Sequence, residues 1–168
     1  PLRLVGSEMC IRDRFCTNPG LVLGIRSPEF SAFLHSLTAK MAEQPPQTLL
    51  NAGGLEGYGK GIAALAAHPG ITHLAGAAQE GKQARPQLFK ADVSLLLEGD
   101  ERLQEEVFGP TTIVVEVADQ AELLEAVKGL HGQLTATLIT EPGDLAGSEE
   151  LFALLEPVSY THLRAHET

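Results

Sequence analysis

Residues 111–117 read TTIVVEV, a run of β-branched and apolar side chains that favours a strand buried on both faces. Directly after this run, Asp119 is placed to cap a helix over residues 120–128. Residues 134–140, LTATLIT, predict a further strand. A strand, a helix and a strand in this order favour an α/β fold whose neighbouring strands run parallel.

The preceding part of the chain continues the alternation of helices and strands. Ser27-Pro28-Glu29 combines a capping serine, a first-turn proline and an acid, and therefore predicts a helix that extends to about Glu43. We thus predict an α/β fold with a mainly parallel sheet flanked by helices. The remaining expected elements are a helix-like or extended segment at 21–25, a helix at 55–67, a strand at 71–75, a polar loop at 76–86, one or two extended segments at 87–97 and a helix at 148–155.

Composition limits the classes of protein to which the chain can belong. Its 168 residues, 43% of them hydrophobic, suit one domain or a large piece of a bigger one. A net charge of −10 argues against a nucleic-acid partner. No apolar run is long enough to cross a membrane, and no secretory leader is visible. Two cysteines give neither a disulfide framework nor a zinc site, which favours a cytoplasmic setting.

Both ends of the chain differ from the rest. RLVGSEMCIRDR (residues 3–14) and VSYTHLRAHET (residues 158–168) can be encoded by DNA strings that resemble a transposon-based sequencing adapter. One string is largely the reverse complement of the other. We therefore expect residues 1–14 and 158–168 to be adapter-like, non-native segments, and residues 15–157 to be the native part, with Cys16 as its one cysteine.

The stretch FCTNPG, residues 15–20, contains the first candidate site residue, Cys16. The Thr-Asn-Pro-Gly sequence that follows is typical of a turn, which can hold a side chain at the edge of a cleft. A thiolate close to backbone N–H groups has a lowered pKa and is a good nucleophile. An isolated cysteine is nevertheless more often a small buried apolar residue. These residues alone leave both interpretations open.

The stretch EEVFGP, residues 105–110, is the second candidate. It directly precedes the strand expected at 111–117, and ligands of α/β sheets bind where loops meet strand ends. A carboxylate there could bind a ribose diol, and the Phe108 ring could pack on a flat heterocycle. The alternative is a solvated acidic turn whose phenylalanine closes the core.

Residues 54–61, GLEGYGKG, come close to the phosphate-binding loop GxxxxGK[ST]. Gly61 replaces the required hydroxyl residue, and no convincing strand precedes the motif, so we interpret it as a flexible turn that leads into a helix. The histidines show no metal-ligand spacing, and we therefore interpret them as structural or surface residues and expect no metal site. These histidines are His35, His68, His73 and His131.

FCTNPG, followed about ninety residues later by EEVFGP, resembles the aldehyde dehydrogenase superfamily over essentially all of residues 15–157. The form FCTNPGLVLG is similar to the branch that contains α-ketoglutaric semialdehyde (2,5-dioxovalerate) dehydrogenases and some fatty-aldehyde dehydrogenases. The resemblance implies a partial catalytic domain from a homo-oligomeric enzyme that oxidises an aldehyde to a carboxylate with NAD or NADP.

The resemblance also implies a role for each matching residue. Cys16 matches the nucleophile, Glu106 the glutamate that binds the nicotinamide ribose, and Phe108 the aromatic residue near the nicotinamide. The family's general base, its oxyanion asparagine and its cofactor domain precede the cysteine, so we expect this chain alone to be inactive. A coenzyme-A-acylating relative and a non-catalytic α/β interaction module remain the alternatives.

Overall fold

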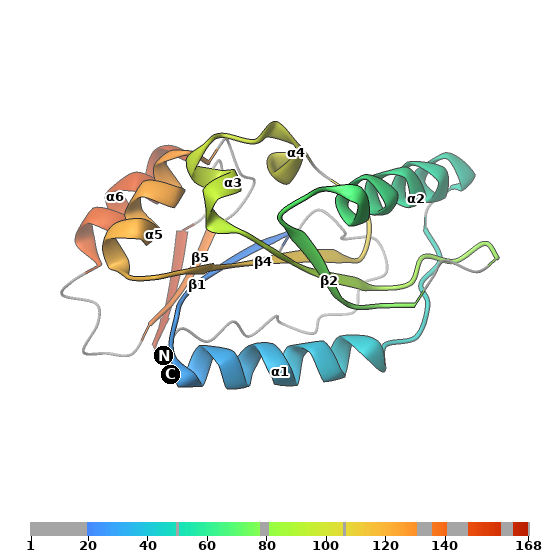
Figure 1. Ribbon diagram of the computed structural model, residues 1–168, viewed down its shortest axis with the longest axis horizontal. Helices are drawn as coiled ribbons and strands as arrows, with labels where there is room; N and C mark the ends of the chain where they lie inside the picture. Colours follow the sequence, from blue (N-terminus) through green and yellow to red (C-terminus); the bar gives the residue numbers. More distant parts are fainter. Residues whose placement is uncertain are drawn as a thin grey trace.

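A computed structural model gives the protein a central four-stranded sheet in the order β1-β4-β3-β2 (Figure 1). β4 pairs in parallel with both β1 and β3, whereas β2 lies at the edge and runs antiparallel to β3. The predicted mainly parallel sheet is therefore confirmed, with one antiparallel edge strand. These strands are β1 (Leu21–Ile25), β2 (Ile71–Ala75), β3 (Gln87–Ala91) and β4 (Thr111–Val117). The structure describes residues 20–49, 51–77, 81–105, 107–130, 136–140, 148–158 and 163–167.

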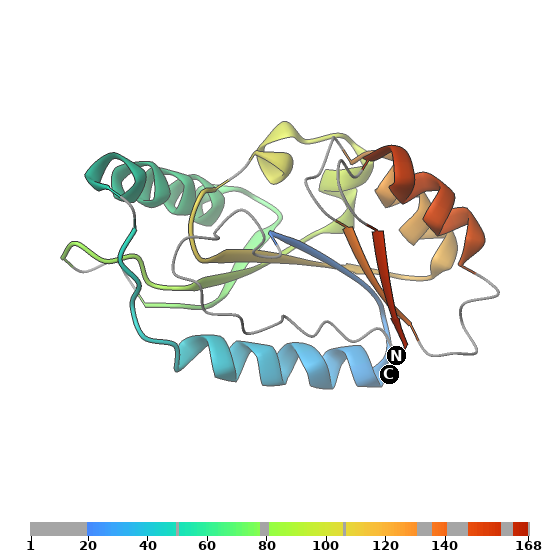
Figure 2. The same ribbon diagram turned by 180° about the vertical axis from the view of Figure 1, so that it is seen from behind.

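Helices cover both faces of this sheet, as Figures 1 and 2 show from opposite sides. α1 lies against one face, and the other helices lie on the opposite side of the molecule. The helices are α1 (Pro28–Ala42), α2 (Ala52–Ala67), α3 (Val93–Leu97), α4 (Glu101–Gln104), α5 (Gln120–Lys128) and α6 (Glu149–Val158). No helix in the described part of the chain combines the length and the apolar character needed to cross a membrane.

β4 lies inside the sheet and is buried on both faces, as its sequence predicted. Val115 belongs to a large core cluster that includes Leu96 of α3 and Leu123 of α5. Its neighbour Val114 belongs to a smaller cluster that includes Phe30 of α1. Because successive side chains of a strand point to opposite faces, an apolar run without alternation fits a strand covered on both sides.

Two predicted helix starts are confirmed. The Ser27 hydroxyl accepts a hydrogen bond from the Phe30 N–H at 3.0 Å, at the start of α1. The Asp119 carboxylate accepts one from the Glu122 N–H at 3.0 Å, at the start of α5. Each of these caps satisfies a backbone donor that has no partner within the helix.

The extended structure predicted for residues 87–97 is correct only for its first half. β3 ends at Ala91, and Val93–Leu97 forms the short helix α3. The sequence VSLLL is too short and too uniformly apolar to show a helical period, and for that reason the prediction fails there. α4 was not predicted at all.

The helix predicted for residues 55–67 is confirmed, whereas the interpretation of residues 54–61 as a flexible turn that leads into a helix is wrong. These residues lie inside α2, which begins at Ala52 after Asn51 accepts a hydrogen bond from the Gly54 N–H at 2.7 Å. A phosphate-binding loop needs backbone N–H groups that point at the ligand, whereas a helix interior uses them in its own hydrogen bonds. The resemblance to that motif therefore does not indicate a phosphate-binding site.

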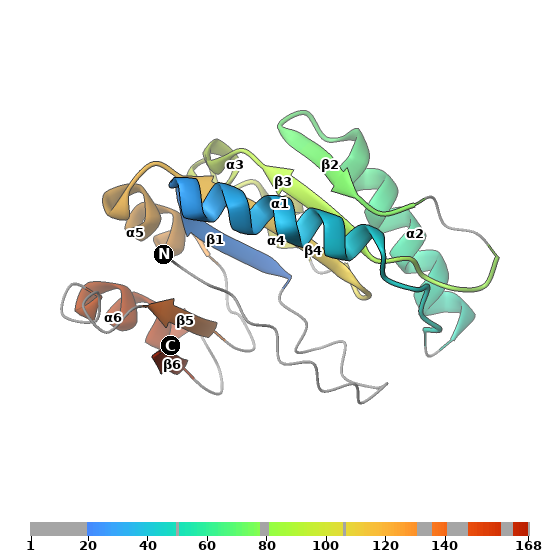
Figure 3. The same cartoon turned by 90° about the horizontal axis from the view of Figure 1, so that it is seen from below.

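A second, two-stranded sheet joins β5 (Ala136–Thr140) in parallel to β6 (Leu163–Glu167), and Figure 3 shows it near α6. β5 agrees with the strand predicted for residues 134–140 over the residues that the structure describes. β6 falls inside the stretch that we expect to be adapter-like, whereas residues 1–14 lie outside the described residues.

Candidate functional site

The parallel pairing of β1 with β4 brings Gly20 and Pro110, the last residues of the two candidate motifs, to one edge of the sheet. Leu21 is in register with Ile113, and the Ile113 N–H donates to the Gly20 carbonyl at 2.8 Å. Gly20 is the last residue of FCTNPG, and Pro110 is the last residue of EEVFGP. Because β1 and β4 run parallel, the segments that precede them meet the sheet at the same edge.

This edge is formed by the amino ends of β1 and β4. The usual rule for open α/β sheets places ligands beyond the carboxyl ends of the strands. At the carboxyl ends of this sheet, Glu116 of β4 instead forms ion pairs with Lys90 of β3 at 2.7 Å and with Arg26 at 2.8 Å. The sequence contains a signal for the amino edge, because each motif directly precedes its strand.

Cys16 and Glu106, two of the predicted site residues, lie outside the described residues, and their roles stay predictions. Phe108 is described and is 45% exposed. The interpretation in which this phenylalanine closes the core is therefore wrong. Within the described residues, Leu97 is the one other large hydrophobic side chain that is similarly exposed. An exposed aromatic face beside this edge could pack against a flat ring.

A sharp turn after Phe108 brings the chain into β4. Gly109 has a φ of +152°, and a Cβ at this position would lie 2.4 Å from the ring of Tyr58. Pro110 then accepts a hydrogen bond at its carbonyl from the Gln87 N–H at 2.9 Å, next to the start of β3. A side chain at residue 109 would be both strained and in collision, so the turn depends on glycine.

Tyr58 of α2 lies under this turn and is only 2% exposed. Its hydroxyl donates to the Arg85 carbonyl at 2.6 Å and lies 3.4 Å from the Pro110 carbonyl. Burial raises the pKa of Tyr58 to about 12, so the hydroxyl keeps its proton at neutral pH and remains a donor. Sequence reasoning missed this contact.

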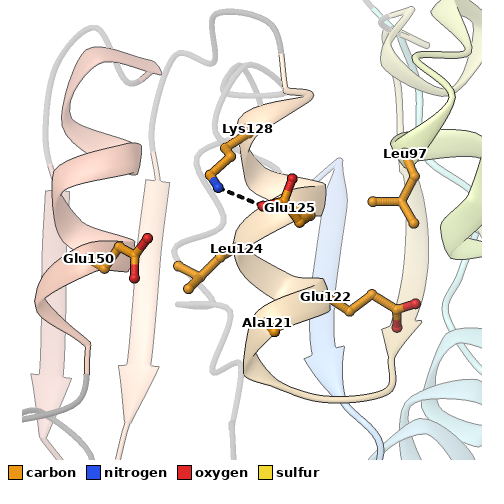
Figure 4. Close-up of a pocket in the computed structure, with 7 residues that line it drawn as sticks. All are labelled: Leu97, Ala121, Glu122, Leu124, Glu125, Lys128 and Glu150. Atoms are coloured by element: carbon orange, nitrogen blue, oxygen red, sulfur yellow. Dashed lines mark hydrogen bonds and ion pairs between the residues drawn. The ribbon is translucent and has the colours of Figure 1, made fainter.

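Two grooves lie on the described surface. One, of about 540 Å³, lies between α2 and the residues on either side of position 106, with Lys60, Arg102 and Glu105 in its lining. The other, of about 510 Å³, lies along α5, where Glu125 pairs with Lys128 at 2.6 Å (Figure 4). The residues of this second groove belong to neither motif, and we therefore do not assign it to the site.

The described histidines have local structural explanations. His35 is exposed on α1, the His68 ring lies 3.1 Å from the Asp100 carboxylate, and the His73 ring lies 2.8 Å from the Gln87 amide oxygen. Their interpretation as structural or surface residues is confirmed, while His131 lies outside the described residues. In the part of the chain that the structure describes, no three His, Cys, Asp or Glu residues gather as a metal site.

Comparison with known sequences finds close relatives. The chain is 47% identical over 144 residues to the α-ketoglutaric semialdehyde dehydrogenase of Acinetobacter baylyi, a match that covers 84% of this chain and 27% of the relative. It is 34% identical over 145 residues to α-ketoglutaric semialdehyde dehydrogenase 2 of Azospirillum brasilense, a match that covers 85% of this chain and 27% of that relative. The chain thus spans about a quarter of the length of these curated relatives. No family model matches the sequence.

Comparison with solved structures shows the same fold in distant sequences. The Δ-pyrroline-5-carboxylate dehydrogenase of Mycobacterium tuberculosis matches with a TM-score of 0.72 at 17% identity, over 89% of this chain and 29% of that chain. An NAD-dependent benzaldehyde dehydrogenase of Corynebacterium glutamicum matches with a TM-score of 0.66 at 20% identity, over 87% of this chain and 31% of that chain. The NAD+ complex of a Bacillus cereus aldehyde dehydrogenase matches with a TM-score of 0.67 at 15% identity, over 88% of this chain and 30% of that chain.

Proposed function

Because this chain belongs to the aldehyde dehydrogenase superfamily, we propose that it is the part of an NAD(P)-dependent enzyme that carries the nucleophile and part of the cofactor site. The whole enzyme oxidises an aldehyde to a carboxylate. The observation that supports this proposal is the register of β1 with β4, because it brings the last residues of FCTNPG and EEVFGP, Gly20 and Pro110, to one edge of the sheet. We also propose that the enzyme is cytoplasmic and homo-oligomeric.

In this proposal the reaction begins at Cys16. Its thiolate forms a bond to the aldehyde carbon, and the carbonyl electron pair moves to the oxygen, which accepts a hydrogen bond from the Cys16 main-chain N–H. A nicotinamide cofactor held by Glu106 and Phe108 would supply the hydride acceptor at that carbon. The result is a thioester at Cys16. The general base that the resemblance implies then takes a proton from water, and the water oxygen attacks the thioester carbon. The carbon–sulfur bond breaks, the thiolate is restored, and the acid product leaves as the carboxylate after it loses its proton to solvent.

The cofactor contacts proposed for this chain come from EEVFGP. Glu106 would accept hydrogen bonds from the hydroxyls of the nicotinamide ribose, and Phe108 would pack near the nicotinamide. The 45% exposure of Phe108 supports this role, since a ring closed into the core could not meet a ligand. NAD is the cofactor to test first, because the titles of two structural neighbours name it.

The substrate that we propose is 2,5-dioxovalerate, the semialdehyde of α-ketoglutarate, which the enzyme would convert to 2-oxoglutarate. The names of both sequence relatives support this choice.

A chimera tests the proposal. Residues 15–157 of this chain replace the matching stretch of the Acinetobacter baylyi relative, and reduction of NAD is followed by absorbance with 2,5-dioxovalerate. We expect turnover, and we expect Cys16→Ser to lower kcat by roughly 10³-fold or more while NAD still binds. A folded chimera that binds NAD but turns over no aldehyde would reject the proposal.

The same chimera separates the two alternatives. A coenzyme-A-acylating enzyme would need free coenzyme A and would release an acyl thioester in place of the carboxylate. A non-catalytic module with a buried thiol would resist iodoacetamide at Cys16 in the folded state, whereas an accessible nucleophilic thiolate reacts quickly.

A further inference from the structure

We propose that α2 holds the turn at residues 107–109 in place, with Gly61 and Tyr58 as positioning residues. This inference rests on the proposed function, because it assumes that Glu106 and Phe108 bind the nicotinamide end of the cofactor. It gives a role to the stretch GLEGYGKG that neither a phosphate loop nor a flexible turn explained. The two residues are three positions apart on α2, and such residues lie on the same side of a helix.

Gly61 is the point where the turn approaches α2 most tightly. A Cβ at this position would lie 2.8 Å from one γ-methyl of Val107, 2.9 Å from the other, and 3.4 Å from its Cβ. Val107 is β-branched, which restricts rotation about its χ1, so its methyl groups cannot easily turn away. Val107 directly follows Glu106 and directly precedes Phe108, so a displacement of Val107 moves both proposed cofactor contacts.

Tyr58 supports the other side of the turn. Its ring fills the space where a Cβ of Gly109 would lie, and its hydroxyl holds the Arg85 carbonyl at 2.6 Å. Leu49 and Ala84 bury the same ring in a small cluster against which Val107 also packs. α2 therefore contacts the residues on both sides of Phe108 and leaves the Phe108 ring exposed.

This support matters because ligand binding depends on sub-ångström placement. A hydrogen-bonding or stacking group is productive only within about 0.5 Å of its proper position, and a misplacement of about 1 Å can cost on the order of 10²-fold. A methyl group added at Gly61 would lie 2.8 Å from Val107, which is closer than an ordinary contact, so Val107 or α2 must shift to admit it. We therefore expect cofactor affinity to respond to changes on α2 that touch no ligand.

A matched pair of variants in the chimera tests this role. Gly61→Ala and Gly57→Ala both replace a glycine of α2, and both should raise its helix propensity equally. A Cβ at Gly57 meets no described atom within 4 Å, whereas one at Gly61 meets Val107. We expect Gly61→Ala to raise the KM for NAD about tenfold, with the aldehyde KM at saturating NAD changed less than about twofold. Gly57→Ala should leave both constants unchanged.

A rescue variant separates positioning from general damage to the fold. Val107→Ala removes the two methyl groups that collide, and the remaining Cβ would meet the added methyl at an ordinary contact distance of 3.4 Å. We expect Gly61→Ala combined with Val107→Ala to return the KM for NAD to within about threefold of the unmodified chimera. A variant that was merely unfolded would lose activity toward both substrates and would show no rescue.

The affinity for NAD is also measured by calorimetry in the Cys16→Ser chimera, which needs no turnover. If the unmodified chimera is inactive, the proposed aldehyde oxidation fails, but the effect of Gly61→Ala on the dissociation constant still tests the role of α2. A folded Gly61→Ala variant that binds NAD within about twofold of the control overturns the inference, as does a failure of Val107→Ala to restore binding.

Discussion

At the scale of single residues, the Ser27 cap at the start of α1 makes a local and measurable contribution. Its hydroxyl is the acceptor for the Phe30 N–H, and Phe30 is only 3% exposed. Replacing a capping serine by alanine costs about 1 kcal/mol of helix stability. For Ser27→Ala we expect the Phe30 amide to exchange its hydrogen about fivefold faster, measured by hydrogen exchange.

The control for this prediction is Ser36→Ala, an exposed position in the middle of the same helix. It should leave the exchange of the Phe30 amide unchanged, because it lies away from the cap. Equal rates in the Ser27→Ala variant and the unmodified chain would mean that the cap does not hold the first turn.

Residues differ in how well the sequence predicts their contacts. The Ser27 cap and the Asp119 cap were predicted because each joins residues three positions apart. The contacts of Gly61 with Val107 and of Tyr58 with Gly109 join residues far apart in the chain. Nothing in the local pattern of either stretch indicates its partner, and so only the folded structure connects α2 with the candidate site.

At the scale of elements, Glu116 connects three neighbouring strands at their carboxyl ends. Its side chain is 13% exposed and lies 2.7 Å from Lys90 of β3 and 2.8 Å from Arg26, which follows β1. The hydrogen bond from Lys90 is the largest influence that holds the pKa of Glu116 below its usual range, and Arg26 adds to it against the opposing effect of burial. The carboxylate is therefore more acidic in the folded chain than in the unfolded chain.

The lowered pKa of Glu116 determines how the stability of the fold depends on pH. A carboxyl group whose folded pKa is lowered stabilises the fold fully above its unfolded pKa of about 4.3, and the contribution disappears as the pH falls through the folded pKa. We expect Glu116→Gln to lower the free energy of unfolding by about 1–2 kcal/mol at pH 7 and by clearly less near pH 3. Urea unfolding at both pH values measures the difference.

Glu125→Gln provides the matched control, because Glu125 pairs with Lys128 at 2.6 Å but its side chain is 62% exposed. Solvent screens an exposed pair, so we expect Glu125→Gln to change the free energy of unfolding much less than Glu116→Gln does at pH 7, and to show little dependence on pH. If the two variants behaved alike, the three-strand ion pairs of Glu116 would have no special effect on stability.

Helices and strands were predictable where the hydrophobic pattern agreed with the residues that begin or end an element. β4 and α5 have the bounds expected from TTIVVEV and from Asp119, because a buried run and a capped amphipathic stretch follow one another. α3 was missed since five mostly apolar residues show no period, and α2 was predicted to begin too late because its glycines suggested a turn. Packing against β2 and Val107 stabilises α2 despite these glycines.

At the scale of the whole molecule, the direction of the strands decides where a site can form. β4 is parallel to β1 and β3, so the amino ends of β1 and β4 lie at one edge and the ion pairs of Glu116 lie at the other. The two motifs could be recognised from the sequence, but their common edge could not, because it depends on which strands become neighbours. Strand order is a property of the complete sheet.

The last prediction concerns residues 158–168, which we expect to be adapter-like. β6 pairs with β5 and packs near α6, and it is not part of the four-stranded sheet. The truncation removes β6 but keeps β5, whose Leu138 packs in the large core cluster, so the main core should be retained. For a chain that ends at residue 157, we expect a Tm within about 2 °C of the 168-residue chain, with faster hydrogen exchange in β5 and unchanged exchange in β4. A fall in Tm of more than about 10 °C would mean that β6 is an integral part of the fold, because a change of that size corresponds to more than about 2 kcal/mol in a chain of this length.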